Sequence, residues 1–358
     1  MIEVDQSKRI VIKFGSGVLT LDAGDHLQID RNVVYRAASE MAEIVSNGGQ
    51  VIVVSSGAIA LGIEEQELSE RPKALADVQA MAAVGQSLLM ALWREAFARK
   101  NIRVGQVLLT HSDLSDRNRY LNVRATLESL LSYGVVPVVN ENDTVMTDEI
   151  TVGDNDNLAT QVAKLIGADT LALLSTVDGV LDKTGSVIEK IGFEDNLDSL
   201  VIGGPSKTGR GGMDSKIASA RAAAHGGISV TIANGKLAGT IKQIALRQPI
   251  GTFIKAEENK LGTRKHWIAY TLKAKGIITV DKGAEEAIVH SGASILPVGI
   301  TDVSGIFDAG ELIAIHNDNG DEIARGLTRL NSQDIEKHMG DKGEPVIHRD
   351  DMVTAIER

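Results

Sequence analysis

The 358-residue chain contains no cysteine, so disulfide bonds, thiolate nucleophiles and cysteine-bound zinc are excluded. It also lacks long hydrophobic runs. None approaches the roughly 18 residues of a membrane-spanning helix, so we expect no membrane segment. The first residues, MIEVDQSKR, lack the basic-then-apolar pattern of a secretory signal. These absences predict a cytoplasmic protein.

Basic residues are outnumbered by acidic ones, and the formal net charge is −11. This balance argues against a chain that coats nucleic acid or an anionic membrane, although it is compatible with a local basic pocket for phosphates. The eight histidines show no metal-ligand spacing such as HExxH, and we predict no dedicated metal site.

The first 235 residues alternate β-branched runs with helical patterns. Runs such as IVIKFGSG, VIVVSSGA and VVPVVNEN are nearly continuous in valine and isoleucine, which suits parallel strands covered on both faces. Segments between the runs, such as 30–47, 75–99 and 118–133, carry apolar residues at helical spacing. The alternation predicts an α/β fold with a doubly wound, mainly parallel sheet.

The pattern changes after about Gly235. Residues 249–267 lose their periodicity, and short strands separated by glycines and turn dipeptides follow from Ala269. We therefore predict a catalytic domain over 1–250, a linker over 251–267 and a small, mostly β domain over 268–358.

Polar residues gather where the predicted strands end. GSG follows the first strand, SSGA the second, NEND the fourth and ST the fifth. Ligands of a doubly wound sheet bind beyond the carboxyl ends of its strands. These four stretches therefore belong to one crevice.

Lys13 lies inside the first apolar run, directly before the GSG turn. A buried ammonium needs a partner. Either Lys13 extends to solvent from an edge strand, or it faces a glycine-rich turn whose N–H groups can hold a phosphate. The turn lacks the Walker A and dinucleotide fingerprints, so it is a weak signal alone.

A second phosphate signal is KTGRGGMDSK, residues 207–216. Its glycines precede a helix that carries Lys216 in the first turn, and helix N-termini attract anions. A surface loop with chance lysines is the alternative, which the presence of Lys13 disfavours.

Residues 152–157, VGDNDN, open a helical pattern with more acids and amides than the single residue that an N-cap needs. The surplus indicates a ligand or a cation. Together with NEND, this stretch could bind an ammonium, orient the lysines or hold Mg²⁺ through phosphates. The VSSGA stretch lacks the GxSxG form of a nucleophilic serine, and binding of a carboxylate fits it better. Together these stretches predict phosphoryl transfer from a nucleotide to a small zwitterionic acceptor.

The chain resembles the glutamate 5-kinase family over essentially its full length. The matching stretches are VIKFGSGVLT, VVSSGAIALG, PVVNENDTV, VGDNDNLA, GRGGMDSK, RKHWI, GASILPVGI and VIHRDDMV. The resemblance implies an amino-acid kinase fold followed by a PUA domain. It also implies ATP- and Mg²⁺-dependent phosphorylation of the γ-carboxylate of L-glutamate for proline synthesis.

The resemblance also implies roles for individual residues. Lys13 and Lys216 would stabilise the transferred phosphoryl group, and Asp156 would orient both lysines. The residues expected at the glutamate site are Ser56, Gly57, Asn140, Asp143, Asp154 and Asn155. Those expected to bind ATP, besides the two lysines, are Gly15, Ser175, Thr176, Arg210, Gly211, Gly212, Met213, Asp214 and Ser215. A homo-oligomer and feedback inhibition by proline are further expectations.

Three positions depart from the family pattern, all near the expected nucleotide. Thr176 stands where the family commonly has aspartate, Leu181 where it has tyrosine, and Arg210 where it has threonine. The expected phosphate chemistry is intact, and the departures concern nucleotide contacts and base preference.

Three alternatives remain open. One is another kinase of the same fold, acting on acetylglutamate, aspartate or carbamate, and the NEND and VGDNDN pair disfavours it. A second is an RNA-binding regulatory protein on a kinase scaffold. However, residues 264–337 contain 8 Lys+Arg against 11 Asp+Glu, so nucleic acid is an improbable partner. The third is a dehydrogenase, for which the GxGxxG spacing is missing.

Overall fold

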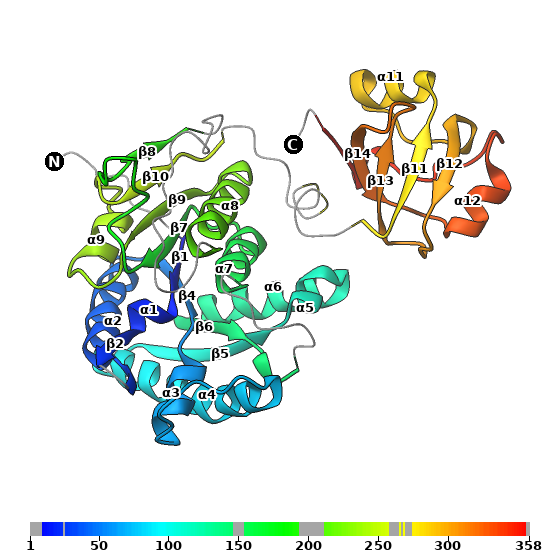
Figure 1. Cartoon of the computed structure of the whole chain (residues 1–358). Helices are drawn as coiled ribbons and strands as arrows, with labels where there is room; N and C mark the ends of the chain where they lie inside the picture. The colour runs from blue at the N-terminus through cyan, green and yellow to red at the C-terminus, as the bar shows by residue number, and fades with distance from the viewer. Residues whose placement is uncertain are drawn as a thin grey trace. The chain divides into compact units, whose positions relative to one another are not determined.

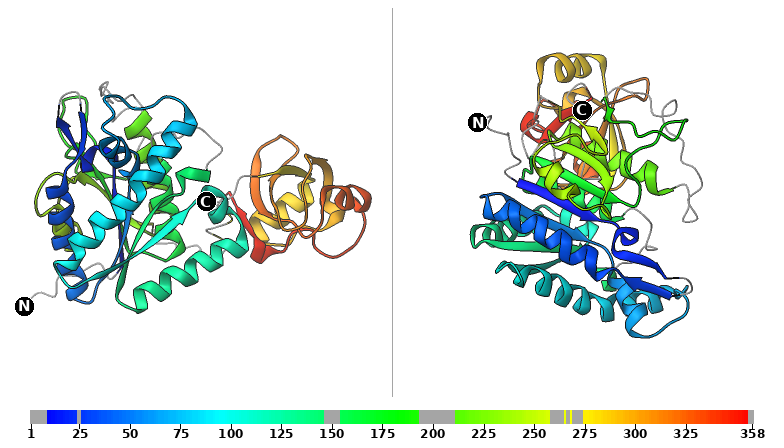
Figure 2. Two further views of the ribbon diagram at one scale, coloured as in Figure 1. Left: turned by 90° about the horizontal axis from the view of Figure 1, so that it is seen from below. Right: turned by 90° about the vertical axis from the view of Figure 1, so that its left-hand side faces the viewer.

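The computed structural model describes residues 9–23, 26–145, 154–192, 211–257, 265, 268 and 274–355. The chain forms two compact units, Met1–Glu258 and Asn259–Arg358. Each unit has a sheet of its own, with eight strands in the first and five in the second (Figure 1). In the first unit, helices lie on both faces of the sheet, as two further views show (Figure 2).

The strand order of the first sheet is β5-β6-β4-β1-β7-β9-β10-β8. The strands are β1 (Arg9–Phe14), β4 (Gln50–Ser55), β5 (Arg103–Leu109), β6 (Val135–Glu141), β7 (Thr170–Ser175), β8 (Lys190–Ile191), β9 (Ser229–Asn234) and β10 (Thr252–Ile254). Neighbours are parallel except β9 and β10. The predicted doubly wound, mainly parallel sheet is confirmed. Strand β1 lies between β4 and β7, where the chain switches from one half of the sheet to the other, which is where such folds bind ligands.

The helices of the first unit follow its strands. They are α1 (Ser16–Leu19), α2 (Arg31–Ser46), α3 (Ala58–Glu65), α4 (Leu75–Ala98), α5 (His111–Ser115), α6 (Arg117–Ser132), α7 (Asp154–Leu165), α8 (Gly211–His225) and α9 (Thr240–Ala245). The short helix η1 (Asp143–Val145) follows β6, and the hairpin β2 (Thr20–Ala23) with β3 (His26–Ile29) follows α1.

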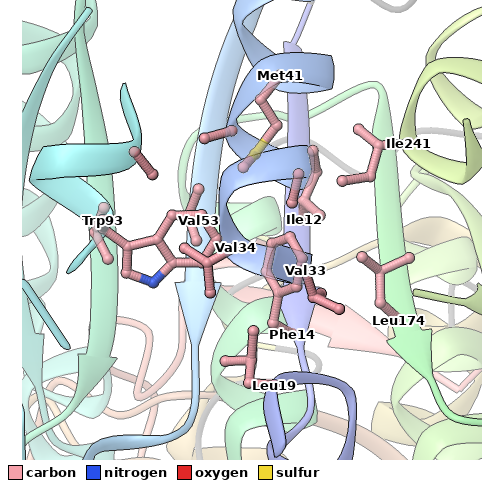
Figure 3. Close-up of a cluster of buried hydrophobic side chains, with 14 of the residues drawn as sticks. Ile12, Phe14, Leu19, Val33, Val34, Met41, Val53, Trp93, Leu174 and Ile241 are labelled. Carbon is pink, nitrogen blue, oxygen red and sulfur yellow. The ribbon is translucent and has the colours of Figure 1, made fainter. Parts of the chain in front are cut away.

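One hydrophobic cluster joins the sheet to helices α2 and α4 (Figure 3). Phe14 of β1 and Trp93 of α4 are fully buried, and their ring centroids lie 5.2 Å apart. Val34 and Met41 of α2 are likewise fully buried. Burial of each such side chain contributes about 1.5–3 kcal/mol relative to exposure. The cluster thus fixes the position of β1, whose end carries Lys13.

Helix α4 is long and apolar enough to cross a membrane by length and composition, with a mean hydropathy of 1.4 over its most apolar stretch. Its sequence nevertheless contains Asp77, Arg94 and Glu95. Its buried face, which includes Leu89, Trp93 and Phe97, belongs to the core of the first unit. It is therefore a core helix that packs with one side only.

Helices α3 and α4 touch backbone to backbone through two glycines. A Cβ atom on Gly85 would lie 1.7 Å from the carbonyl oxygen of Ala58, and one on Gly62 would lie 1.9 Å from that of Met81. No side chain fits at either contact. The glycines therefore set the distance between α4 and the start of α3.

The predicted linker begins later than expected. Thr252–Ile254, inside the predicted range 251–267, is strand β10, which pairs antiparallel with β9 and parallel with β8. Gly251 precedes it with φ +61° and turns the chain into this pairing. The TFI triplet is β-branched and aromatic, which suits a short strand. The remainder of the linker assignment stays a prediction.

The second unit is built around the strand order β12-β11-β13-β14-β15. Its elements are β11 (Gly276–Val280), α11 (Lys282–Ser291), η3 (Pro297–Gly299), β12 (Ile300–Ser304), β13 (Leu312–His316), β14 (Glu322–Leu327), α12 (Ser332–His338), η4 (Arg349–Asp351) and β15 (Met352–Thr354). All pairings are antiparallel except β11 with β13. A separate cluster that includes Ile278, Ile313 and Ile347 forms its core. The predicted small, mostly β module is confirmed.

Candidate active site

Lys13 lies on the central strand of the first sheet, where its backbone pairs with Val54 on one side and Leu173 on the other. The residue is 4% exposed. The edge-strand interpretation is therefore wrong. A Cβ atom on Gly15 would lie 3.6 Å from Lys13 Nζ, so the ammonium sits directly against the turn that ends β1.

Asp156 brings the two predicted lysines together. Its Oδ1 lies 2.6 Å from Lys13 Nζ, and its Oδ2 lies 2.6 Å from Lys216 Nζ. The carboxylate is fully buried, and the side chains of Lys13 and Lys216 are 5% and 13% exposed. Each lysine contacts a different oxygen of the same carboxylate, so the three residues form one cluster.

The N-terminal parts of two adjacent helices hold this cluster. Asp156 is the third residue of α7, and Lys216 is the sixth of α8. The helices contact each other, and Thr160 Oγ1 donates to the carbonyl of Ser219, 3.1 Å away. Both helix N-termini carry partial positive charge, which favours anions. The site therefore combines two ammonium groups with two helix ends.

Burial and a neighbouring cation weaken the proton affinity of Lys13. Its pKa falls from 10.5 to about 8, chiefly because burial disfavours the charged form, while Asp156 opposes the shift and Lys216 adds to it. One carboxylate thus serves two cations. The cluster carries excess positive charge in a protected place, which suits it to a polyanion.

A chain of side-chain hydrogen bonds lies beside the lysines. Asn155 Nδ2 donates to Ser56 Oγ at 2.8 Å and to Asn140 Oδ1 at 3.2 Å. Asn140 Nδ2 in turn donates to Gln86 Oε1 at 2.9 Å. Ser56, Asn140 and Asn155 were predicted to lie together, and the structure brings them together. Gln86 of α4 also belongs to this chain of hydrogen bonds, although it was not among the predicted site residues.

The turn after β4 holds Ser56. Its N–H donates to the carbonyl of Phe14 at 3.2 Å, which ties the end of β4 to the end of β1. Gly57 follows with φ +108°, a conformation that side chains rarely adopt, and precedes α3. Ser55 Oγ accepts from Trp93 Nε1 and donates to the Ser56 carbonyl, both at 2.9 Å.

The remaining predicted residues lie around these two groups or outside the described part. Asp143 is half-buried at the start of η1, which contacts α4. Ser175 ends β7, and the neighbouring Thr176 is exposed. Gly212, Met213, Asp214 and Ser215 occupy the first turns of α8. Arg210 lies outside the described residues, as do the surroundings of Gly211 and Asp154.

Sequence reasoning missed Gln86 and Trp93. Both lie on α4, seven residues apart and so on the same side of the helix. The sequence predicted only an amphipathic helix there. The one available signal is Gly85, because a glycine inside a helical pattern often marks a close packing contact.

Within the described ranges, no group of three or more histidine or acidic side chains could enclose a metal ion.

Two largely buried lysines share one carboxylate at the switch point of a parallel sheet, an arrangement suited to binding a phosphoryl group. Residues 8–234 match the amino acid kinase family, and residues 276–349 match the PUA domain. The glutamate 5-kinase of Cupriavidus metallidurans is 42% identical over 98% of this chain and 98% of its own. Those of Caldanaerobacter subterraneus and Teredinibacter turnerae are 40% and 41% identical, each over 98% of both chains. The chain belongs to the amino acid kinase family and, within it, to the glutamate 5-kinases.

Proposed function

We propose that the chain transfers the γ-phosphoryl group of ATP to the γ-carboxylate of L-glutamate, forming γ-glutamyl 5-phosphate as the first step of proline biosynthesis. The observation that carries this proposal is the Lys13–Asp156–Lys216 cluster. Beside it lies a chain of hydrogen-bonded side chains, called the amide chain below, which consists of Ser56, Asn155, Asn140 and Gln86. The cluster suits a phosphoryl group in transfer, and the amide chain suits a small polar acceptor.

The reaction needs no general base. The acceptor carboxylate is already ionised near neutral pH, so its oxygen can attack the phosphorus directly while the bond to the ADP oxygen breaks. Rate acceleration then comes from alignment and from neutralising charge on the phosphoryl oxygens. Lys13 and Lys216 supply that positive charge, and Asp156 holds both ammonium groups in place before the nucleotide binds.

The acceptor would bind between the amide chain and the acids near it. The Ser56 hydroxyl can donate to a carboxylate, and Asn155 Oδ1, which is buried without a partner, can accept from an ammonium. Asp143 and Asp154 would add negative charge toward the ammonium. Gly57 leaves room at the turn.

The nucleotide would bind over Gly15, Ser175, Thr176 and the start of α8 from Gly211 to Lys216. The family resemblance adds Arg210 to this set. Mg²⁺ bound to the phosphates would supply further neutralisation of their charge. The described residues fit this arrangement because they offer cations and helix ends to phosphates rather than a closed metal cage.

An acyl-phosphate trap tests the proposal. Purified protein is incubated with ATP, Mg²⁺, hydroxylamine and L-glutamate, with aspartate and N-acetylglutamate in parallel. We expect γ-glutamyl hydroxamate from glutamate alone. Product only from another acceptor would keep the phosphotransferase assignment and reject glutamate. No product from any acceptor would reject the activity and favour the regulatory, RNA-binding alternative.

Further expectations belong to this proposal. We expect a cytoplasmic homo-oligomer that proline inhibits, and a second unit that regulates or packs rather than binds RNA. Adding proline to the hydroxamate assay tests the inhibition. A filter-binding assay with structured RNA tests the last point, since tight and salt-sensitive retention would contradict it.

A further inference from the structure

Gln86 occupies the far end of the amide chain from the lysines. Asn155, adjacent in sequence to Asp156, begins the chain, Asn140 continues it, and Gln86 ends it. Gln86 Oε1 accepts from Asn140, but Gln86 Nε2 is buried without a hydrogen-bond partner. A buried donor that is left unpaired destabilises the folded protein. Such a cost at a polar cluster indicates a group that arrives with a ligand.

The fold holds Gln86 in this position. Gly85, its neighbour, lies against the Ala58 carbonyl so closely that no Cβ fits, and Ala58 directly follows Gly57. Trp93 is buried on the same side of α4, seven residues after Gln86, and its Nε1 donates a hydrogen bond to Ser55 Oγ. Gln86 is therefore not a surface side chain that happens to fold inward. The contacts of α4 hold it beside the acceptor turn.

The unpaired atoms of the chain match opposite ends of a zwitterion. Gln86 Nε2 is an unpaired donor, which suits a carboxylate, and Asn155 Oδ1 is an unpaired acceptor, which suits an ammonium. The γ-carboxylate of the acceptor must lie at the lysines, where transfer occurs. The carboxylate left for Gln86 is therefore the α-carboxylate.

We propose that Gln86 is a specificity-determining residue, whose Nε2 donates a hydrogen bond to the α-carboxylate of the amino-acid acceptor. The inference rests on the proposed function and names how that site recognises the backbone end of its substrate. It requires an acceptor with a free α-carboxylate, and it predicts discrimination against the α-carboxamide analogue of glutamate.

The sharpest test is Gln86→Glu. Glutamate at this position keeps the length and the acceptor for Asn140 Nδ2, but replaces the donor with an anionic oxygen. We expect KM for L-glutamate to rise roughly 10- to 100-fold, as loss of a hydrogen bond to a charged group implies. We expect KM for ATP to change by less than about twofold. The preference for L-glutamate over its α-carboxamide analogue should shrink, because the new carboxylate can accept from the carboxamide.

Two matched variants accompany it. Gln86→Met keeps the side-chain length without polar atoms. It should raise KM for L-glutamate, and the variant should still not prefer the α-carboxamide analogue over L-glutamate. Ser87→Ala, on the exposed side of α4, removes a hydroxyl that donates to the Val84 carbonyl of its own helix and should leave all constants unchanged.

Unchanged KM for L-glutamate and unchanged discrimination in Gln86→Glu would overturn the inference. A parallel rise in KM for ATP would also overturn it, because that result indicates a loosened helix. These failures differ from failure of the proposed function, in which the wild-type chain itself would give no γ-glutamyl hydroxamate.

Discussion

Lys13 Nζ lies 2.6 Å from Asp156 Oδ1, although the two side chains are 5% and 0% exposed. The same carboxylate holds Lys216 through its other oxygen. Buried ion pairs are weak evidence for stability, because desolvation can exceed the attraction between the charges. Their position at the phosphate end of the sheet gives this arrangement a functional reason.

Asp156→Asn should lower kcat strongly with modest effects on KM. Asparagine keeps the shape but cannot hold two ammonium groups, so both lysines lose their alignment on the transferred phosphoryl group. We expect a loss of roughly 100- to 1000-fold in kcat, as for removal of a preorganised electrostatic group. Steady-state hydroxamate kinetics measure it. Near-normal turnover would remove Asp156 from the mechanism.

Activity at low nucleotide concentration should fall as pH rises through the Lys13 pKa of about 8. Lysine loses its charge above its pKa, and the neutral amine cannot stabilise phosphate. Asp156 opposes the lowering of this pKa, so Asp156→Asn should move the falling limb to lower pH. The profile of kcat/KM for ATP measures both. A flat profile from about pH 7 to 9 would contradict the assignment.

Stability provides the control for this profile. The unfolded chain binds the Lys13 proton up to a pKa of 10.5, whereas the folded chain releases it near 8. Between these values the unfolded state binds more protons, so the free-energy cost of burying this group falls as pH rises. As pH rises through this range, titration of Lys13 therefore increases stability while it lowers activity. Thermal unfolding recorded at each pH separates the two.

Gly85→Ala should destabilise the first unit. Its Cβ would lie 1.7 Å from the Ala58 carbonyl oxygen and 2.5 Å from the Gly62 nitrogen, and backbone atoms cannot yield as a flexible side chain can. Overpacking of this kind costs about 1–3 kcal/mol or more. Chemical denaturation measures the loss. Ser87→Ala on the exposed side of the same helix should be neutral, and equal behaviour of the two variants would refute the close contact.

Ser55→Ala should cost less stability in a Trp93→Phe background than in the wild-type protein. The single change leaves the buried Trp93 Nε1 without its acceptor, which costs about 1–3 kcal/mol, and that part of the loss is absent once the donor has been removed. A double-mutant cycle on unfolding free energies measures the difference. Additive losses would show that the two residues are not coupled.

The sequence predicted the parts of the site that local patterns specify. Lys13 interrupts an apolar strand, and VGDNDN exceeds the needs of a helix cap, so both were visible along the chain. The strand-end rule then placed them in one crevice. Gln86 was not predictable in this way, because its role depends on how closely α4 approaches α3. That distance is set by two glycines in separate helices, and no periodic pattern records it.

The start of the linker was missed for a related reason. Thr252–Ile254 is a three-residue strand whose only specification is its pairing with β9 and β8. Short strands lack enough alternation for a period to be recognised.

The bond between Trp93 and Ser55 has a spectroscopic consequence. The chain has two tryptophans, of which Trp93 is fully buried, donates to Ser55, and so lies one residue from the hydroxyl that would meet the acceptor. The indole is a fluorophore whose emission responds to its local field. In a Trp267→Phe background the tryptophan emission would come from Trp93 alone, on α4 next to the acceptor turn, and we expect it to respond to acceptor binding independently of turnover.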